Sequence, residues 1–178
     1  MPEYPRRHER YSKKVDIYQK TTDLYTDRDN VNHLTVVSDI KKDRVEAAYY
    51  IETSSGKVSL KWYGSTLSSF EIPAYVKAGK RKFSVTSIGS NAFQECKLAS
   101  VIIGKNVKTI KKNAVKGQKK LKEIHITAAK LKTVGKDAFK DIAKSAVFYI
   151  TGSASDFERV KSLITASGIG NKVSFEMT

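Results

Sequence analysis

Three segments of the chain share one nine-residue pattern, and this repetition constrains the fold more than any other feature. The segments read VTSIGSNAF at 85–93, VKTIKKNAV at 107–115 and LKTVGKDAF at 131–139, so their starts lie 22 and 24 residues apart. A period of this size is typical of solenoids. One unit is too small to bury its own apolar face, so each unit must stack on the next. Such a stack offers a long surface rather than an enclosed catalytic pocket.

The second part of each repeat predicts a strand. Apolar residues flank a central position in the triplets Val101-Ile102-Ile103, Ile124-His125-Ile126 and Phe148-Tyr149-Ile150. Alternation with period two turns the flanking residues inward and places Ile102, His125 and Tyr149 on the outward face. A leucine precedes the first two strands, as Leu98 and Leu121, and Ser145 takes its place in the third.

A short polar residue and an alanine occupy matching positions in the three nine-residue segments. The pairs are Asn91-Ala92, Asn113-Ala114 and Asp137-Ala138, each followed by a larger apolar residue. Asn and Asp side chains can bond the backbone of a helical turn or cap it. The expected order in each repeat is therefore strand, short strand or turn, helical turn, strand.

The first repeat carries a more specific resemblance. Residues 85–104 match V-x-x-I-G-x-x-A-F-x-x-C-x-L-x-x-V-x-I-G. This pattern resembles the BspA-like leucine-rich repeats (type 5) of bacterial surface and secreted proteins. The resemblance implies an α/β repeat solenoid, a right-handed stack with parallel strands, short helical turns, an N-terminal β cap and a C-terminal helix-strand cap. The middle repeat departs from the pattern, because Lys111 replaces the glycine and Val115 the aromatic residue.

The resemblance also implies a division of the chain. Residues 1–45 form an N-terminal extension or arm, and residues 46–178 form the repeat domain, with 46–84 as N-terminal cap and partial repeat, 85–106, 107–130 and 131–154 as repeats, and 155–178 as C-terminal cap. Turns are expected at Ser55-Gly56 and Gly79-Lys80. At the far end, Ser155 to Glu158 has the sequence of a capping box, and Gly168 stands where the helix should end.

The first 45 residues match no pattern that assigns a role. Strands are expected near 15–18 and 34–37, with a turn at 27–30. The region is a linker, a tag-like extension or an arm that docks on a partner, and the sequence leaves these three open. Asp27 and Asp29 hint at a calcium loop, but the glycine and distal glutamate of an EF-hand are missing, so chance explains them better.

Several function classes are disfavoured. The three histidines are isolated, so we expect no catalytic residues, no metal site, no cofactor and no enzyme activity. Cys96 is better explained as a buried thiol than as a nucleophile. No apolar run is long enough to insert in a membrane. No signal peptide is visible, so the extracellular or cell-surface location that the resemblance implies would belong to a larger or processed chain.

Positive charge is concentrated on the repeats. The net charge is +15, and residues 75–144 hold 18 basic and 4 acidic side chains, a difference of +14. In register, nine lysines form columns: Lys97, Lys120 and Lys144; Lys108 and Lys132; Lys112 and Lys136; Lys116 and Lys140. These basic columns can hold a polyanion such as nucleic acid, teichoic acid or a sulphated glycan. Alternatively, they only keep an apolar stack soluble.

Two functions follow from these features. The first is a non-catalytic protein-interaction or adhesion module that binds a host or cell-surface protein through its strand face, at Ile102, His125, Tyr149, Glu123 and Val147. The second is a basic protein that binds an anionic polymer through the lysine columns. A third interpretation of the strand face stays open, in which the N-terminal arm or a second copy covers it for structural reasons. The sequence does not predict the oligomeric state.

Overall fold

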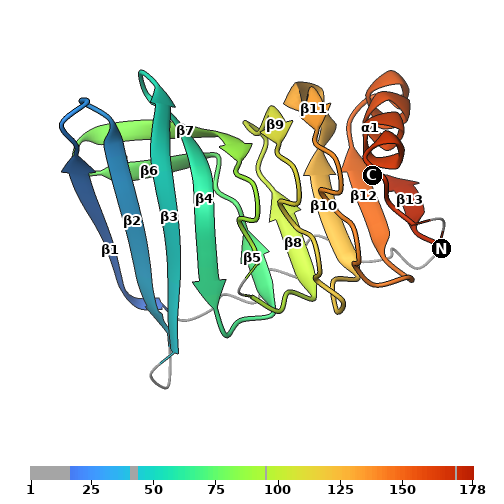
Figure 1. Ribbon diagram of the computed structural model, residues 1–178, viewed down its shortest axis with the longest axis horizontal. Helices are drawn as coiled ribbons and strands as arrows, with labels where there is room; N and C mark the ends of the chain where they lie inside the picture. The colour runs from blue at the N-terminus through green and yellow to red at the C-terminus, as the bar shows by residue number, and fades with distance from the viewer. Residues whose placement is uncertain (1–16, 41–43, 95, 171) are drawn as a thin grey trace, which may run out of the picture.

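The repeats and the N-terminal region form one elongated row of strands, closed at its far end by a helix (Figure 1). The computed structural model describes residues 17–40, 44–94, 96–170 and 172–178. Sheet A runs in the order β1 (Ile17–Thr26), β2 (Asn32–Ile40), β3 (Arg44–Ser54), β4 (Lys57–Ser65), β7 (Arg81–Ile88), β9 (Thr109–Ile110) and β11 (Thr133–Val134), and β6 (Tyr75–Ala78) pairs with β7. Sheet B runs in the order β13 (Ser174–Met177), β12 (Val147–Thr151), β10 (Glu123–Thr127), β8 (Ser100–Ile103) and β5 (Ser69–Glu71).

The central strands of sheet B, β8, β10 and β12, are those that the repeats predict. Its pairs are all parallel, and Ile126 lies opposite both Ile103 and Ile150. The expected adjacency of these three strands is confirmed. Ile103, Ile126 and Ile150 are buried because period-two alternation turns them toward one continuous apolar core.

Sheet A is mixed rather than parallel. Strands β1 to β4 are antiparallel neighbours, whereas β4, β7, β9 and β11 pair in parallel. Gly56 and Gly79 have φ of 68° and 58° at the two expected turns, between β3 and β4 and between β6 and β7. Residues 17–40, expected to belong to an extension, form β1 and β2. Strand β2 pairs with β3 and β1 with β2, so both extend the sheet of the N-terminal cap. The boundary at residue 45 itself stays a prediction.

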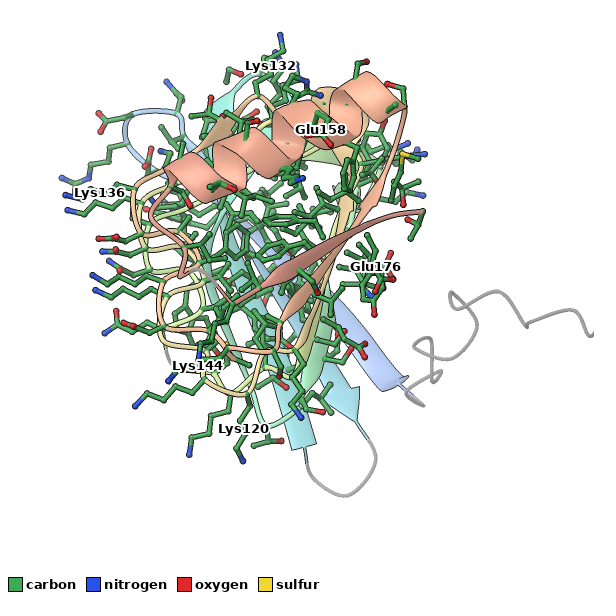
Figure 2. The ribbon with its side chains drawn as sticks, turned by 90° about the vertical axis from the view of Figure 1, so that its right-hand side faces the viewer. Lys120, Lys132, Lys136, Lys144, Glu158 and Glu176 are labelled. Carbon is green, nitrogen blue, oxygen red and sulfur yellow. The ribbon has the colours of Figure 1, made fainter. Side chains whose placement is uncertain are left out.

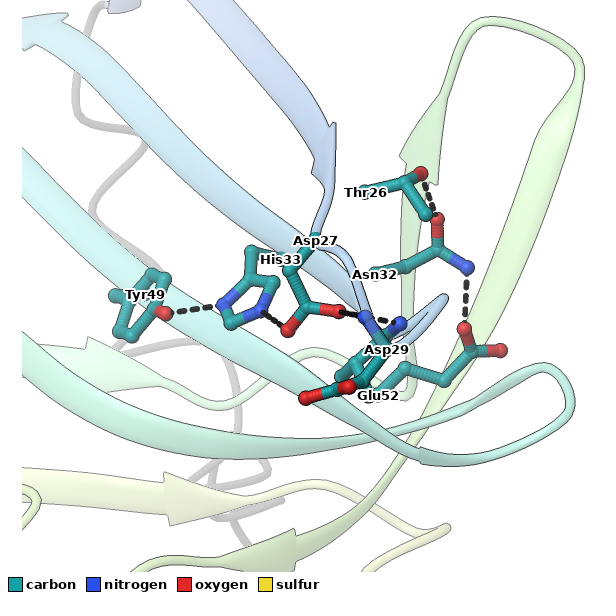
Figure 3. A network of polar contacts seen from close by, with 8 residues as sticks. Thr26, Asp27, Asp29, Asn32, His33, Tyr49 and Glu52 are labelled. Atoms are coloured by element: carbon teal, nitrogen blue, oxygen red, sulfur yellow. Dashed lines mark hydrogen bonds and ion pairs between the residues drawn. The ribbon is translucent and has the colours of Figure 1, made fainter.

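A polar network fastens the turn between β1 and β2 (Figure 3). Asp27 Oδ1 accepts the backbone N–H groups of Asp29 and Val31, and its Oδ2 lies 2.8 Å from His33 Nε2. His33 Nδ1 in turn lies 2.5 Å from the hydroxyl of Tyr49. The contact with His33 and the two backbone N–H groups lower the pKa of Asp27. This carboxylate therefore shapes the turn between β1 and β2.

The turns of the repeats differ from the short helical turns that were expected. Asn91, Asn113 and Asp137 have φ of 57°, 57° and 58°, the left-handed conformation that Asn and Asp tolerate better than most residues. This conformation prevents a right-handed helix from forming through the turn. The amides of Phe93 and Val115 instead donate to the carbonyls of the next coil, Ala114 O and Ala138 O. A 3-10 helix, η2 (Ala128–Lys130), follows β10.

The third repeat fills its core in a different way from the first two. Leu98 and Leu121 are fully buried, but Ser145, at the position expected to replace them, is exposed. Ala146 is buried in its place, and Ile142 and Ala143 pack against the core beside it. A polar hydroxyl would need a partner in this apolar interior, so the next residue in the chain occupies the space.

The C-terminal cap is a helix and a strand, as expected, but its start is shifted. Helix α1 (Ala154–Ala166) has Ser153 as N-cap, and Ser153 Oγ accepts the N–H of Asp156 at 3.2 Å. The expected N-cap, Ser155, lies inside the helix. Ser153 has the extended backbone that an N-cap needs, directly after β12 and Gly152. Gly168, with φ 91°, follows the C-cap as expected.

Two further expectations concern the interior and the membrane. Cys96 is buried, its thiol donates to Phe93 O, and burial raises its pKa to about 12. The described thiol is therefore protonated and inert at neutral pH. None of the described helices is long and apolar enough to cross a membrane.

Candidate functional site

The outward side of sheet B, here named the strand face, brings the predicted contact residues together. Ile102 lies opposite His125, and His125 lies opposite Tyr149. Glu123 lies opposite Val147 on one side and Ser100 on the other. The five residues proposed from the sequence therefore occupy two adjacent rows across β8, β10 and β12. Whether they bind a partner stays a prediction.

Aromatic packing organises the centre of the strand face. The rings of His125 and Tyr149 are stacked, with centroids 4.8 Å apart and an interplanar angle of 15°. Their side chains and that of Ile102 are half-buried. Cross-strand neighbours on parallel strands about 4.8 Å apart stack in this way, so the strand register itself positions the two rings. The result is a patch with both apolar area and polar atoms.

Two acidic residues at the ends of this row were not singled out from the sequence. Glu71 on β5 lies opposite Ile102, and Glu176 on β13 lies opposite Tyr149. Both are exposed. The same period-two alternation could have identified them from the sequence. Phe70 and Phe175 point inward, so the residues that follow them, Glu71 and Glu176, point outward. With Glu123, the strand face carries three glutamates.

The five strands of sheet B carry no lysine or arginine. The basic columns lie elsewhere on the molecule. Viewed from the C-terminal end, Lys136 projects on the side opposite Glu176, while Lys120 and Lys144 lie at the lower edge and Lys132 at the top (Figure 2). The structure thus separates an acidic and aromatic strand face from basic turns.

The nine lysines of the basic columns are all exposed. Backbone hydrogen bonds between coils support their register. Lys132 N donates to Lys108 O at 2.8 Å, Asn113 N to Lys136 O at 3.2 Å, and Gly117 N to Lys140 O at 2.8 Å. Within the described ranges, none of the nine forms an ion pair. Their positive charge is therefore not neutralised by neighbouring carboxylates.

Recesses and side-chain clusters offer little for catalysis or metal binding. In the part of the chain that the structure describes, no group of three or more His, Cys, Asp or Glu side chains is placed to hold a metal ion. A recess of about 440 Å³ lies between β1, β3 and β5, with Glu46 and Glu71 among its lining residues. Glu46 accepts the hydroxyl of Tyr63 at 2.9 Å. This recess adjoins the strand face through Glu71.

One solved structure matches most of the chain with a TM-score of 0.50, and two others match a smaller part of it. A leucine-rich cell surface protein from Faecalibacterium prausnitzii A2-165 matches over 89% of this chain and 43% of its own, with 16% identity and a TM-score of 0.50. Leucine-rich repeat proteins from Bacteroides ovatus and Bacteroides capillosus match 58% and 59% of this chain and 36% and 94% of their own. Their identities are 22% and 21%, with TM-scores of 0.45 and 0.43. The chain spans less than half the length of the first two.

Sequence comparison identifies the repeats themselves. No curated protein matches the chain. The family model for the BspA type leucine rich repeat region matches residues 61–159 in six copies, which is more than half of the chain, and no catalytic family is indicated. The matched residues include β5, β8, β10 and β12, four of the strands of sheet B. The chain therefore belongs to the BspA-type leucine-rich repeat family.

Proposed function

We propose that this chain is a non-catalytic interaction module of a bacterial cell-surface or secreted protein. It presents a right-handed repeat stack whose strand face binds a host or cell-surface protein. Family membership supports this role, since stacked repeats supply extended binding surfaces. The similar fold of a leucine-rich cell surface protein supports the location.

The row of Ile102, His125 and Tyr149 is the observation that carries the proposal. Large apolar and aromatic side chains in a central patch, ringed by polar residues, are typical of the energetically dominant part of an interface. Here the patch is held by a stacked pair, and serine, threonine and glutamate side chains surround it. A rigid aromatic anchor loses little conformational freedom on binding.

The test compares partner capture by two variants. Ile102→Ser with Tyr149→Ser should abolish retention of a binding protein from a host or cell-surface extract. Thr127→Ser with Thr151→Ser, in the next row of the strand face, is the matched control and should retain it. Equal melting temperatures would show that both variants fold. Capture by the first variant at the wild-type level would contradict the proposal.

A second candidate function is polyanion binding by the basic columns. It is favoured by nine exposed lysines in register, without ion pairs in the described residues. Replacing Lys112, Lys136 and Lys140 by Glu should weaken binding to heparin or DNA and reduce the slope of log affinity against log salt, by up to about 0.9 per lost DNA phosphate contact. An unchanged slope would contradict this role.

A further inference from the structure

We propose that residues 1–16 of this chain bind its own strand face. The proposal rests on the proposed function, because it concerns the same strand face. It names the chemistry that the strand face accepts: a basic segment with aromatic residues. Residues 1–16 lie outside the described part of the chain. Three observations carry the proposal: the chemistry of the strand face, the sequence of the segment and the place where the described chain begins.

Charge complementarity selects this segment. The strand face carries Glu71, Glu123 and Glu176, and its five strands contain no lysine or arginine. Residues 1–16 hold five basic and three acidic side chains, and the five basic ones all lie within residues 6–14. In a chain of net charge +15, a surface with three glutamates and no lysine or arginine attracts a basic segment, while the basic columns repel it.

The centre of the strand face adds two features that charge alone does not explain. Its middle row is Ile102, His125 and Tyr149, a surface suited to aromatic neighbours such as Tyr4 and Tyr11. Beside this row, Ser100 is 7% exposed, and its Oγ has no hydrogen-bond partner within the described ranges. A buried hydroxyl requires a partner. A polypeptide laid across the strands supplies backbone groups that can meet it.

The segment starts close enough to reach. Strand β1 begins at Ile17, at the lower edge of the molecule in the view of Figure 1. Strands β5 and β8 begin at the same lower edge. Thr22 of β1 and Glu71 of β5 line the same recess. Crossing from β5 to β13 requires about 19 Å, four steps of roughly 4.8 Å. Sixteen extended residues span up to about 53 Å, so the whole row lies within reach.

A tethered segment has a high effective concentration at its site. Residues 1–16 would therefore compete with any external partner for the same row. Binding of such a partner would require the segment to leave, so the segment would act as a built-in competitor that sets the threshold for capture.

Limited proteolysis of the full chain tests the proposal. Chymotrypsin cleaves after aromatic residues, and Tyr11 lies in the middle of the segment. Mass spectrometry follows the appearance of fragment 12–178. We expect Glu71→Lys with Glu176→Lys to speed this cleavage about tenfold, because the segment then spends more time unbound. Raising the salt from about 50 to 500 mM should speed it in the wild type, because screening weakens exposed charge pairs.

The matched control makes the same change in net charge elsewhere. Asp29→Lys with Glu158→Lys alters two exposed acids away from sheet B and should leave the cleavage rate unchanged. Arg6→Glu with Arg7→Glu should speed cleavage, and combining these with the two strand-face reversals should restore protection. Melting temperatures check that every variant folds.

Three outcomes would overturn the proposal. The first is equal cleavage rates in the strand-face variant, the control and the wild type. The second is a combined variant, carrying both the arginine and the strand-face reversals, that chymotrypsin cleaves as fast as either parent variant. The third is protection that grows between about 1 and 100 µM protein, which would assign the segment to the strand face of a second copy. Partner capture is measured separately, so loss of this proposal leaves the proposed function standing, and the reverse also holds.

Discussion

Each repeat turn contains one residue in the left-handed conformation. Replacing such a residue by glycine or by alanine should change the free energy of unfolding by different amounts. Asn113 has φ of 57°, and its Oδ1 is buried without a hydrogen-bond partner in the described residues. We expect Asn113→Gly to leave the free energy of unfolding within about 0.5 kcal/mol of the wild type, because glycine adopts this conformation without steric cost and little side-chain bonding is lost. We expect Asn113→Ala to lower it by about 1 kcal/mol, because alanine keeps the Cβ that crowds the following carbonyl but lacks the short polar side chain that makes the left-handed conformation tolerable for asparagine.

Urea denaturation at 25 °C measures this difference, and thermal melting checks it. For a domain of this size, 1 kcal/mol corresponds to about 2–4 °C in melting temperature. Lys116, three residues later and without a positive φ, is the control position. There the order should reverse, with alanine tolerated and glycine costing about 0.5–1 kcal/mol. Equal losses for both substitutions at Asn113 would show that its side chain, not its backbone conformation, matters.

Three other properties follow from the buried and titrating groups. Phe139→Ala should lower the free energy of unfolding by about 3–5 kcal/mol, because Phe139 is fully buried and packs edge-on against Phe148 at 5.2 Å; a urea midpoint equal to that of wild type would refute this register. Cys96 should react with iodoacetamide at pH 8 only upon unfolding, because burial raises its pKa; rapid labelling of the native protein would contradict this. Asp27 has a lowered pKa in the folded state, chiefly through His33, so its contribution to stability is complete above its ordinary pKa near 3.8 and is lost as pH falls through the folded value; the melting temperature of Asp27→Asn should therefore approach that of the wild type only at pH values below 3.8, as Asp27 becomes protonated in the folded protein, and a gap that widens there would contradict this linkage.

The strands of the repeats could be predicted because their alternation has a single buried solution. A shift of one residue would turn Ile126 outward and His125 into the core, so the register of β8, β10 and β12 follows from sequence. The same reasoning placed Ile102 opposite His125. Burial of Cys96 also follows, because the repeat sets its position.

The parts that sequence reasoning missed depend on contacts between distant segments. Strands β1 and β2 join β3 through antiparallel pairing, and residues 17–40 show no repeat that would predict this. Glu71 and Glu176 belong to the strand face only because β5 and β13 flank the repeats. The shift of the helix start to Ser153 depends on local backbone conformation, which two nearby serines make ambiguous. Each of these features requires tertiary structure.

The most direct test of the proposed function compares the two surfaces in one binding experiment. The wild type, the variant Ile102→Ser with Tyr149→Ser, and the variant with Lys112, Lys136 and Lys140 replaced by Glu are exposed to the same cell-surface extract at about 50 and 500 mM salt. The amount of captured protein is measured for each. We expect loss of capture in the strand-face variant alone, and capture by the wild type should not fall as the salt rises. Capture that survives in the strand-face variant but disappears in the lysine variant, and falls steeply with salt, would contradict the proposed function.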